Sequence, residues 1–144
     1  MTALELLVAL IKEFEGCKLK AYTCPAGIWT IGYGATGPHI TKGTVWTQQQ
    51  ADEALLETAV NCLHTAIKLS PILRDESIYK QAAIADFIYN LGAGNYLKSS
   101  LKLRVNQKNW TAAQHEIKKW DKVKGVPLKG LIKRRAKEAE LILQ

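Results

Sequence analysis

The stretch EGCKLKAYTCPAGIWTIGYG, residues 15–34, marks the change from a helical to a strand pattern and so decides the fold. Its only acidic side chain, Glu15, stands directly before Gly16. Glycine accepts the left-handed conformation that is common just past a helix C-terminus, so this pair predicts the end of a helix. Strand-forming residues punctuated by glycines follow, with a tight turn predicted at residues 24–27 (CPAG). We therefore expect a small, twisted antiparallel sheet within residues 19–46.

An amphipathic helix is predicted before this stretch, over residues 1–14 (MTALELLVALIKEF). Its apolar residues recur at helical spacing, which favours packing on a core. The segment is not typical of a signal sequence, because it lacks a basic start and a cleavage site and Glu5 interrupts its apolar run. It is also too short to span a bilayer. We therefore expect a chain made without an export signal or anchor of its own.

The rest of the chain is predicted to be helical. Residues 47–50 (TQQQ) match a capping box, and apolar residues then recur at three- and four-residue steps up to Ser70, which indicates one long helix. A small sheet among helices gives an α+β fold. The other predicted helices cover about residues 75–91, about 97–105, a segment opened by a second capping box at 111–114 (TAAQ), and about 128–143.

The composition indicates one globular domain with a basic surface. A chain of 144 residues is long enough to bury one core, and 47% hydrophobic with 23% charged residues is far from a disordered composition. The net charge is +7, and residues 97–144 carry thirteen Lys and Arg against four Asp and Glu. Such a surface attracts polyanions, whether nucleic acid, anionic lipid or cell wall. Charge alone does not choose among them.

The cysteines indicate neither a disulfide framework nor a metal centre. Cys17, Cys24 and Cys62 have no repeated CxxC spacing, and Cys62 with His64 is too small a ligand set. We expect no metal, no cofactor and a reducing compartment. Cys17 and Cys62 are interpreted as packing residues.

Glu15 is the first candidate for chemistry. It lies in the last turn of the predicted helix, where the helix dipole and apolar packing from neighbours such as Tyr22 would favour a protonated carboxyl group. A protonated carboxyl can donate to a departing sugar oxygen, as glycosidases require. On spacing alone, a surface glutamate beside a capping glycine explains the same pattern.

The same stretch resembles the catalytic signature of the phage-type lysozymes, glycoside hydrolase family 24. That signature is Glu, eight residues, Asp or Cys, five residues and Thr, and Glu15, Cys24 and Thr30 match it. The resemblance continues through ADFIYNLGAGNYLKSSL (85–101) and GLIKRRAKE (from 130). It implies a single lysozyme domain with a substrate groove between two lobes. The parts would be a β-containing lobe at about 15–46, a connecting helix at about 47–69, and a helical lobe at about 70–144 that includes the N-terminal helix 1–14.

By this resemblance Glu15 is the general acid, Cys24 stands where many relatives carry Asp, and Thr30 positions the attacking water. The reaction would be hydrolysis, with inversion, of the β-1,4 bond between N-acetylmuramic acid and N-acetylglucosamine in peptidoglycan. A thiol with an ordinary pKa near 8.5 is mostly protonated at neutral pH, which makes it a poorer base than aspartate. Three roles therefore stay open for Cys24: a thiolate base or electrostatic stabiliser, a thiol that only orients water, or an inert small hydrophobe.

Sugar binding is the second group of expectations from the resemblance. Tyr89 also sits at helical spacing with apolar residues, so a core aromatic explains it equally well. Trp110 and Trp120 are interpreted as packing residues, and Glu13 is expected to point to another side of its helix than Glu15. The residues expected to contact substrate across the groove are Tyr89, Asn90, Ser100, Thr36 and Gln114.

The function expected from the resemblance is that of an endolysin from a bacteriophage or prophage. Its substrate would be the glycan strands of peptidoglycan, and we expect a monomer in the host cytoplasm that relies on a holin-type membrane permeabiliser to reach the wall. Three alternatives stay open: a lytic transglycosylase, a basic nucleic-acid-binding module, and a wall-binding protein without catalysis.

Overall fold

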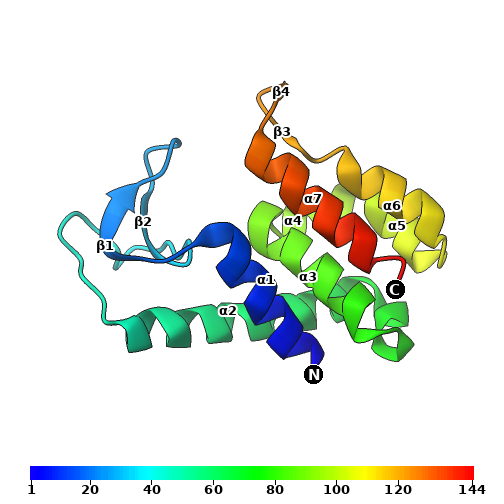
Figure 1. The fold of residues 1–144 in the computed structure, drawn as a ribbon, viewed down its shortest axis with the longest axis horizontal. Helices are drawn as coiled ribbons and strands as arrows, with labels where there is room; N and C mark the ends of the chain where they lie inside the picture. Colours follow the sequence, from blue (N-terminus) through cyan, green and yellow to red (C-terminus); the bar gives the residue numbers. More distant parts are fainter.

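The computed structural model describes all residues, 1–144, and has an α+β fold (Figure 1). Two short antiparallel hairpins, β1–β2 and β3–β4, lie among helices. The predicted fold class is thus confirmed. In chain order the elements are α1 (Ala3–Glu15), β1 (Lys18–Thr23), β2 (Trp29–Gly32), α2 (Gln48–Leu69), the 3₁₀ turn η1 (Pro71–Asp75), α3 (Ile78–Leu91), α4 (Ala93–Lys98), α5 (Ser100–Asn106), α6 (Trp110–Lys118), β3 (Lys122–Val123), β4 (Val126–Pro127) and α7 (Lys129–Leu141).

Helix α1 ends where the sequence predicts. Its last residue is Glu15, and Gly16 follows with φ of 65°, a conformation that favours glycine. The chain then enters β1, turns at residues 24–27 through a hydrogen bond from the Gly27 amide to the Cys24 carbonyl oxygen (2.8 Å), and returns along β2. The regular sheet is smaller than predicted, because beyond Gly32 only isolated bridges continue it.

Helix α2 runs from the β1–β2 hairpin to the helical part of the molecule (Figure 1). It opens with the predicted capping box, in which the Gln50 amide donates to Thr47 Oγ1 (3.1 Å) and the Thr47 amide donates to Gln50 Oε1 (2.8 Å). Its buried residues recur at helical spacing and face the core. Neither α2 nor any other helix combines the length and apolar character needed to cross a bilayer.

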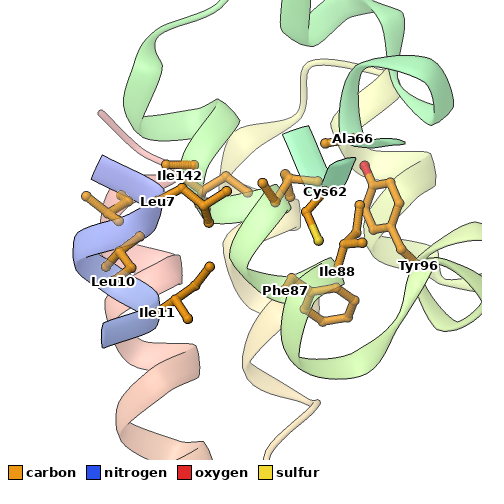
Figure 2. Close-up of a cluster of buried hydrophobic side chains, with 14 of the residues drawn as sticks. Leu7, Leu10, Ile11, Cys62, Ala66, Phe87, Ile88, Tyr96 and Ile142 are labelled. Carbon is orange, nitrogen blue, oxygen red and sulfur yellow. The ribbon is translucent and has the colours of Figure 1, made fainter. Parts of the chain in front are cut away.

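Two hydrophobic clusters of unequal size hold the fold together. The larger is centred on α3 and joins it to the other helices; Leu7 and Ile11 of α1 and Phe87 of α3 belong to it (Figure 2). A small cluster of Ala21, Ile31 and Ile40 lies under the β1–β2 hairpin. Trp46 packs against both clusters. The hairpin thus has its own small core beside the main one.

Three local predictions need correction. Helix α6 begins at Trp110 instead of after a Thr111 capping box, because the Asn109 side chain caps it by accepting from the Ala112 amide (3.2 Å). The helix predicted at 97–105 is two helices, since Ser99 ends α4 and caps α5. The β3–β4 hairpin was not predicted, because its strands are only two residues each and its turn depends on positive φ at Lys124 and Gly125.

Candidate active site

Glu15 stands at the end of α1, where two other parts of the chain enclose it. Its side chain is 23% exposed, and its Oε2 accepts a hydrogen bond from Arg134 Nη1 of α7 at 2.8 Å. The loop after β2 approaches from the other side, since a Cβ at Gly34 would lie 3.2 Å from Glu15 Oε1. The carboxyl group is therefore held in a defined position instead of pointing into bulk solvent.

Arg134 is itself held in place by Asp86 of α3. It is buried, and its Nε and Nη2 donate to Asp86 Oδ2 (2.9 Å) and Oδ1 (2.8 Å), a bidentate pair between α7 and α3. Burial alone would lower the pKa of Arg134, but the hydrogen bonds and charge of Asp86, and then of Glu15, raise it instead. Arg134 is thus always positively charged, and its Nη1 remains to donate to Glu15.

Cys24 and Thr30 occupy the turn and second strand of the β1–β2 hairpin. Hydrogen bonds from the backbone amides of Ile28 and Ala26 lower the pKa of the Cys24 thiol. Thr30 is 5% exposed, and its hydroxyl donates to the Ile28 carbonyl oxygen at 3.0 Å. A lowered pKa gives Cys24 more thiolate at neutral pH than an ordinary cysteine, which favours a chemical role over inert packing.

The hydroxyl of Tyr22 responds to the charges of both the acid and the thiol. Burial raises the pKa of this hydroxyl, and the negative charges of Glu15 and then Cys24 raise it further. Tyr89 behaves similarly from α3: burial and then the charge of Glu15 raise its pKa, and its hydroxyl donates to the Tyr33 carbonyl oxygen. Both tyrosines stay neutral at physiological pH.

A pocket of about 350 Å³ lies between the end of α1 and the start of α7. Of the expected sugar-binding residues, only Asn90 lines it together with Glu15, and Asn90 Oδ1 accepts from Arg135 Nη2 at 2.8 Å. Glu13 also lines this pocket and, unlike Glu15, a neighbouring pocket beside Lys137 and Glu140. The lining residues are Glu13, Phe14, Glu15, Asn90, Leu128, Gly130, Leu131, Lys133 and Arg134.

The other expected sugar-binding residues lie outside this pocket. Ser100 is exposed and lines a second pocket of about 510 Å³ beside Trp120. Thr36 is exposed in the loop after β2. Gln114 is half-buried, and its amide donates to the Ala139 carbonyl oxygen at 3.4 Å, which ties α6 to α7.

The packing role predicted for two cysteines and two tryptophans holds for some of them and not for others. Cys62 is buried as predicted, and burial, followed by the charge of Asp86, raises its pKa to about 11. The packing interpretation of Cys17 is wrong, because it is exposed, 3.9 Å from Gln48 Nε2. The packing role of Trp110 and Trp120 is confirmed, since both pack against the larger hydrophobic cluster.

Known proteins resemble this chain in sequence. The family model described as Phage lysozyme matches residues 12–138 of the chain. An endolysin of Acyrthosiphon pisum secondary endosymbiont phage 1 is 38% identical over 141 residues, covering 93% of this chain and 92% of that protein. The chain belongs to the phage lysozyme family. As a phage lysozyme it is a glycoside hydrolase, and its expected family and endolysin class are confirmed.

Solved structures place the same fold in other lysozymes. The endolysin from Escherichia coli O157:H7 phage FAHEc1 superposes with a TM-score of 0.87 at 29% identity, covering 100% of this chain and 94% of that one. The muramidase domain of SpmX from Asticaccaulis excentricus superposes with a TM-score of 0.84 at 29% identity, covering 96% and 95%. The lysozyme-like arrangement of a small β lobe, a long helix and a larger helical lobe is therefore confirmed.

Sequence reasoning missed the charged residues behind Glu15 in this phage lysozyme. Arg134 has no role in the sequence-based predictions beyond the basic charge of residues 97–144, yet it is the direct partner of the proposed acid. The available signal was Asp86, a lone acid within the apolar run AAIADFI (82–88). A buried carboxylate needs a charged or hydrogen-bonded partner, and the arginines of α7 provide one.

Proposed function

We propose that this phage lysozyme hydrolyses the β-1,4 bond between N-acetylmuramic acid and N-acetylglucosamine in peptidoglycan, as the endolysin that releases phage by host lysis. The observation that carries the proposal is the position of Glu15, a partly shielded carboxyl group that Arg134 holds in a pocket at the end of α1. Inverting glycoside hydrolysis requires such a proton donor and a second group that takes the proton of the attacking water.

Glu15 acts as the general acid in this proposal. Its protonated carboxyl donates to the oxygen of the departing sugar, which leaves a carboxylate behind. The guanidinium of Arg134, 2.8 Å from Oε2, stabilises that carboxylate through a charge-assisted hydrogen bond. The tyrosines near Glu15 stay neutral and add no competing negative charge.

Cys24 and Thr30 prepare the attacking water. The Thr30 hydroxyl gives its proton to the Ile28 carbonyl oxygen, so its lone pairs remain to accept a hydrogen bond from water. The Cys24 thiolate then takes the proton from that water as it attacks, and the product is inverted at the anomeric carbon. The lowered pKa of Cys24 supports the thiolate role among the three that the sequence left open.

Substrate contacts are proposed on both sides of the groove. Asn90 has the best support, because it shares the pocket of Glu15 and its amide nitrogen is free to donate to an N-acetyl carbonyl. Tyr89 would offer only its ring, since its hydroxyl is bonded to Tyr33. Substrate contacts by Thr36, Ser100 and Gln114 are proposed from the family resemblance alone. None of the three lines the pocket of Glu15.

The cellular setting follows from the same proposal. The chain works as a single, monomeric lysozyme domain on the cell wall, stays in the host cytoplasm until lysis, and reaches the wall after a holin-type protein permeabilises the membrane. A lytic transglycosylase would instead form a 1,6-anhydro-muramic product, which is lighter by one water. Mass analysis of digested sacculi therefore separates the two reactions.

The test is the clearing of outer-membrane-permeabilised Gram-negative cells. Glu15→Gln keeps the shape of the side chain but removes the transferable proton, so clearing should fall by roughly 10²–10⁴-fold. Glu13→Gln is the matched control, because it changes an acid on the same helix and the same pocket wall. Retained clearing by Glu15→Gln, or loss in both variants, would reject the assignment.

A further inference from the structure

The β3–β4 hairpin has no role in the proposed mechanism, yet it exposes apolar side chains. It projects from the helical part of the molecule at the start of α7 (Figure 1). All eight residues from 122 to 129 (KVKGVPLK), which we call the hairpin patch, are exposed. Val123, Val126 and Leu128 are 49, 59 and 44% exposed. Three neighbouring apolar side chains left in water mark a candidate interaction surface.

The three apolar side chains share one face of the hairpin. Val123 pairs with Val126 across the strands, and directly opposed residues point to the same side. The Leu128 amide donates to the Asp121 carbonyl oxygen at 3.0 Å, which continues the antiparallel pairing, and Leu128 itself is extended. Because side chains alternate along an extended chain, Leu128 lies on the same side as Val126. The hairpin patch therefore presents one continuous apolar face.

Positive charge surrounds this face. Lys122, Lys124 and Lys129 belong to the hairpin patch, which contains no acidic residue. Of these three lysines only Lys122 is ion-paired, to Asp121 at 2.8 Å. Lys124 stands in the turn with φ of 50°, a conformation that favours Asn, Asp or Gly, so a lysine is less stable there than an asparagine. The hairpin patch thus combines net positive charge with an apolar face.

An anionic lipid bilayer is the partner that fits both properties. Its headgroups attract the lysines, and its interfacial region takes the apolar side chains out of water. Soluble polyanions such as nucleic acid or acidic wall polymers attract only the lysines. Binding of single-stranded nucleic acid also uses aromatic side chains for stacking, and the hairpin patch has none. The combination therefore favours a membrane surface over a soluble polyanion.

We propose that the hairpin patch binds the surface of an anionic lipid bilayer, with its apolar face inserted among the headgroups and its lysines paired with lipid phosphates. The contact is peripheral and reversible, because three short apolar side chains bury little surface. This inference goes beyond the proposed hydrolysis and does not depend on it. In the proposed cellular setting, the contact keeps the enzyme at the membrane that separates the cytoplasm from the wall.

Co-sedimentation of the full chain with vesicles tests the inference. Vesicles of phosphatidylcholine and phosphatidylglycerol in equal parts should bind the protein, and added salt should weaken this binding. Vesicles of phosphatidylcholine alone should bind it much more weakly. Lys124→Asn suits the positive φ of the turn and should lower the affinity for the anionic vesicles roughly fivefold. Val126→Thr keeps the branched side chain and should lower it roughly threefold.

Matched controls for both variants lie in the β lobe. Lys42→Asn removes an exposed lysine, and Val45→Thr changes a valine that is 66% exposed, both outside the hairpin patch. These two variants should bind the anionic vesicles as the wild type does. Equal losses in the control variants and the patch variants would overturn the inference, because net charge or exposure alone would then explain binding. Equal binding to both kinds of vesicle would overturn it as well.

Hydrolysis of purified sacculi, which contain no membrane, separates this inference from the proposed function. Glu15→Gln should lose hydrolysis and keep vesicle binding. Lys124→Asn and Val126→Thr should lose vesicle binding and keep hydrolysis. If these two variants instead bind vesicles normally and hydrolyse sacculi with a raised KM, the hairpin patch binds the glycan substrate and the inference is wrong.

Discussion

Gly34 offers the sharpest test of how the β lobe positions the carboxyl group of Glu15, the proposed general acid. Its φ is 89°, and a Cβ there would lie 3.2 Å from Glu15 Oε1 and 3.5 Å from Glu15 Cδ. Gly34→Ala thus has two effects. The left-handed backbone costs about 1 kcal/mol with an alanine side chain, and the new methyl group displaces the Glu15 carboxyl group by a few tenths of an ångström.

Gly43→Ala separates these two effects. Gly43 has nearly the same φ, 90°, but nothing lies within 4 Å of a Cβ at that position. Both variants should lose about 1 kcal/mol of unfolding free energy, or roughly 3 °C in Tm for a chain of this size. Only Gly34→Ala should also lose activity, by about tenfold, because small errors in the position of a catalytic group are costly.

The assay is the initial rate of hydrolysis of purified sacculi at a temperature where both variants are folded, alongside Tm by calorimetry. Equal activity in the two variants would refute the reasoning, since it would mean that the loop at Gly34 does not set the position of Glu15. A loss of activity in Gly43→Ala as large as in Gly34→Ala would refute it equally, because strain alone would then explain the effect.

Other predictions address the thiol and the buried acid. Cys24→Asp should stay active with its acidic limb moved to lower pH, whereas Cys24→Ala should lower the rate markedly at every pH, as measured by pH–rate profiles. Thiol alkylation in a Cys17→Ser background should abolish most activity, because the remaining accessible thiol is Cys24, and full activity after complete modification would remove Cys24 from the mechanism. Burial raises the pKa of Glu138 in the folded protein, so the wild type should lose stability relative to Glu138→Gln as pH rises above the unfolded pKa of glutamate. Urea unfolding at several pH values measures this, and a difference in unfolding free energy that does not change with pH would contradict it.

Local signals in the sequence predicted the elements that depend on neighbouring residues. The end of α1 at Gly16 and the capping box at the start of α2 need only a few adjacent side chains, and both were found where expected. The second capping box failed because Asn109 offered an alternative cap two residues earlier. Both Asn109 and Thr111 are residues that can cap a helix, and the sequence alone does not distinguish between them.

The candidate site also combines residues that a local pattern predicts with residues that only distant contacts bring together. Glu15, Cys24 and Thr30 are predicted through the family resemblance, from their spacing within one short stretch. Arg134 was missed because its partners, Glu15 and Asp86, lie 119 and 48 residues away in the chain. No local pattern distinguishes a lysine-rich exposed surface from one arginine that turns inward to pair with a carboxylate.

The central claim is that Glu15 supplies the proton to the departing sugar. The most direct test compares Glu15→Gln with the wild type on two substrates: natural glycan strands, and an oligosaccharide with an activated aryl leaving group that needs no protonation. The account predicts a loss of roughly 100-fold or more on the glycan and a much smaller loss on the aryl glycoside. Equal losses on both substrates would contradict it, because Glu15 would then serve some purpose other than proton donation.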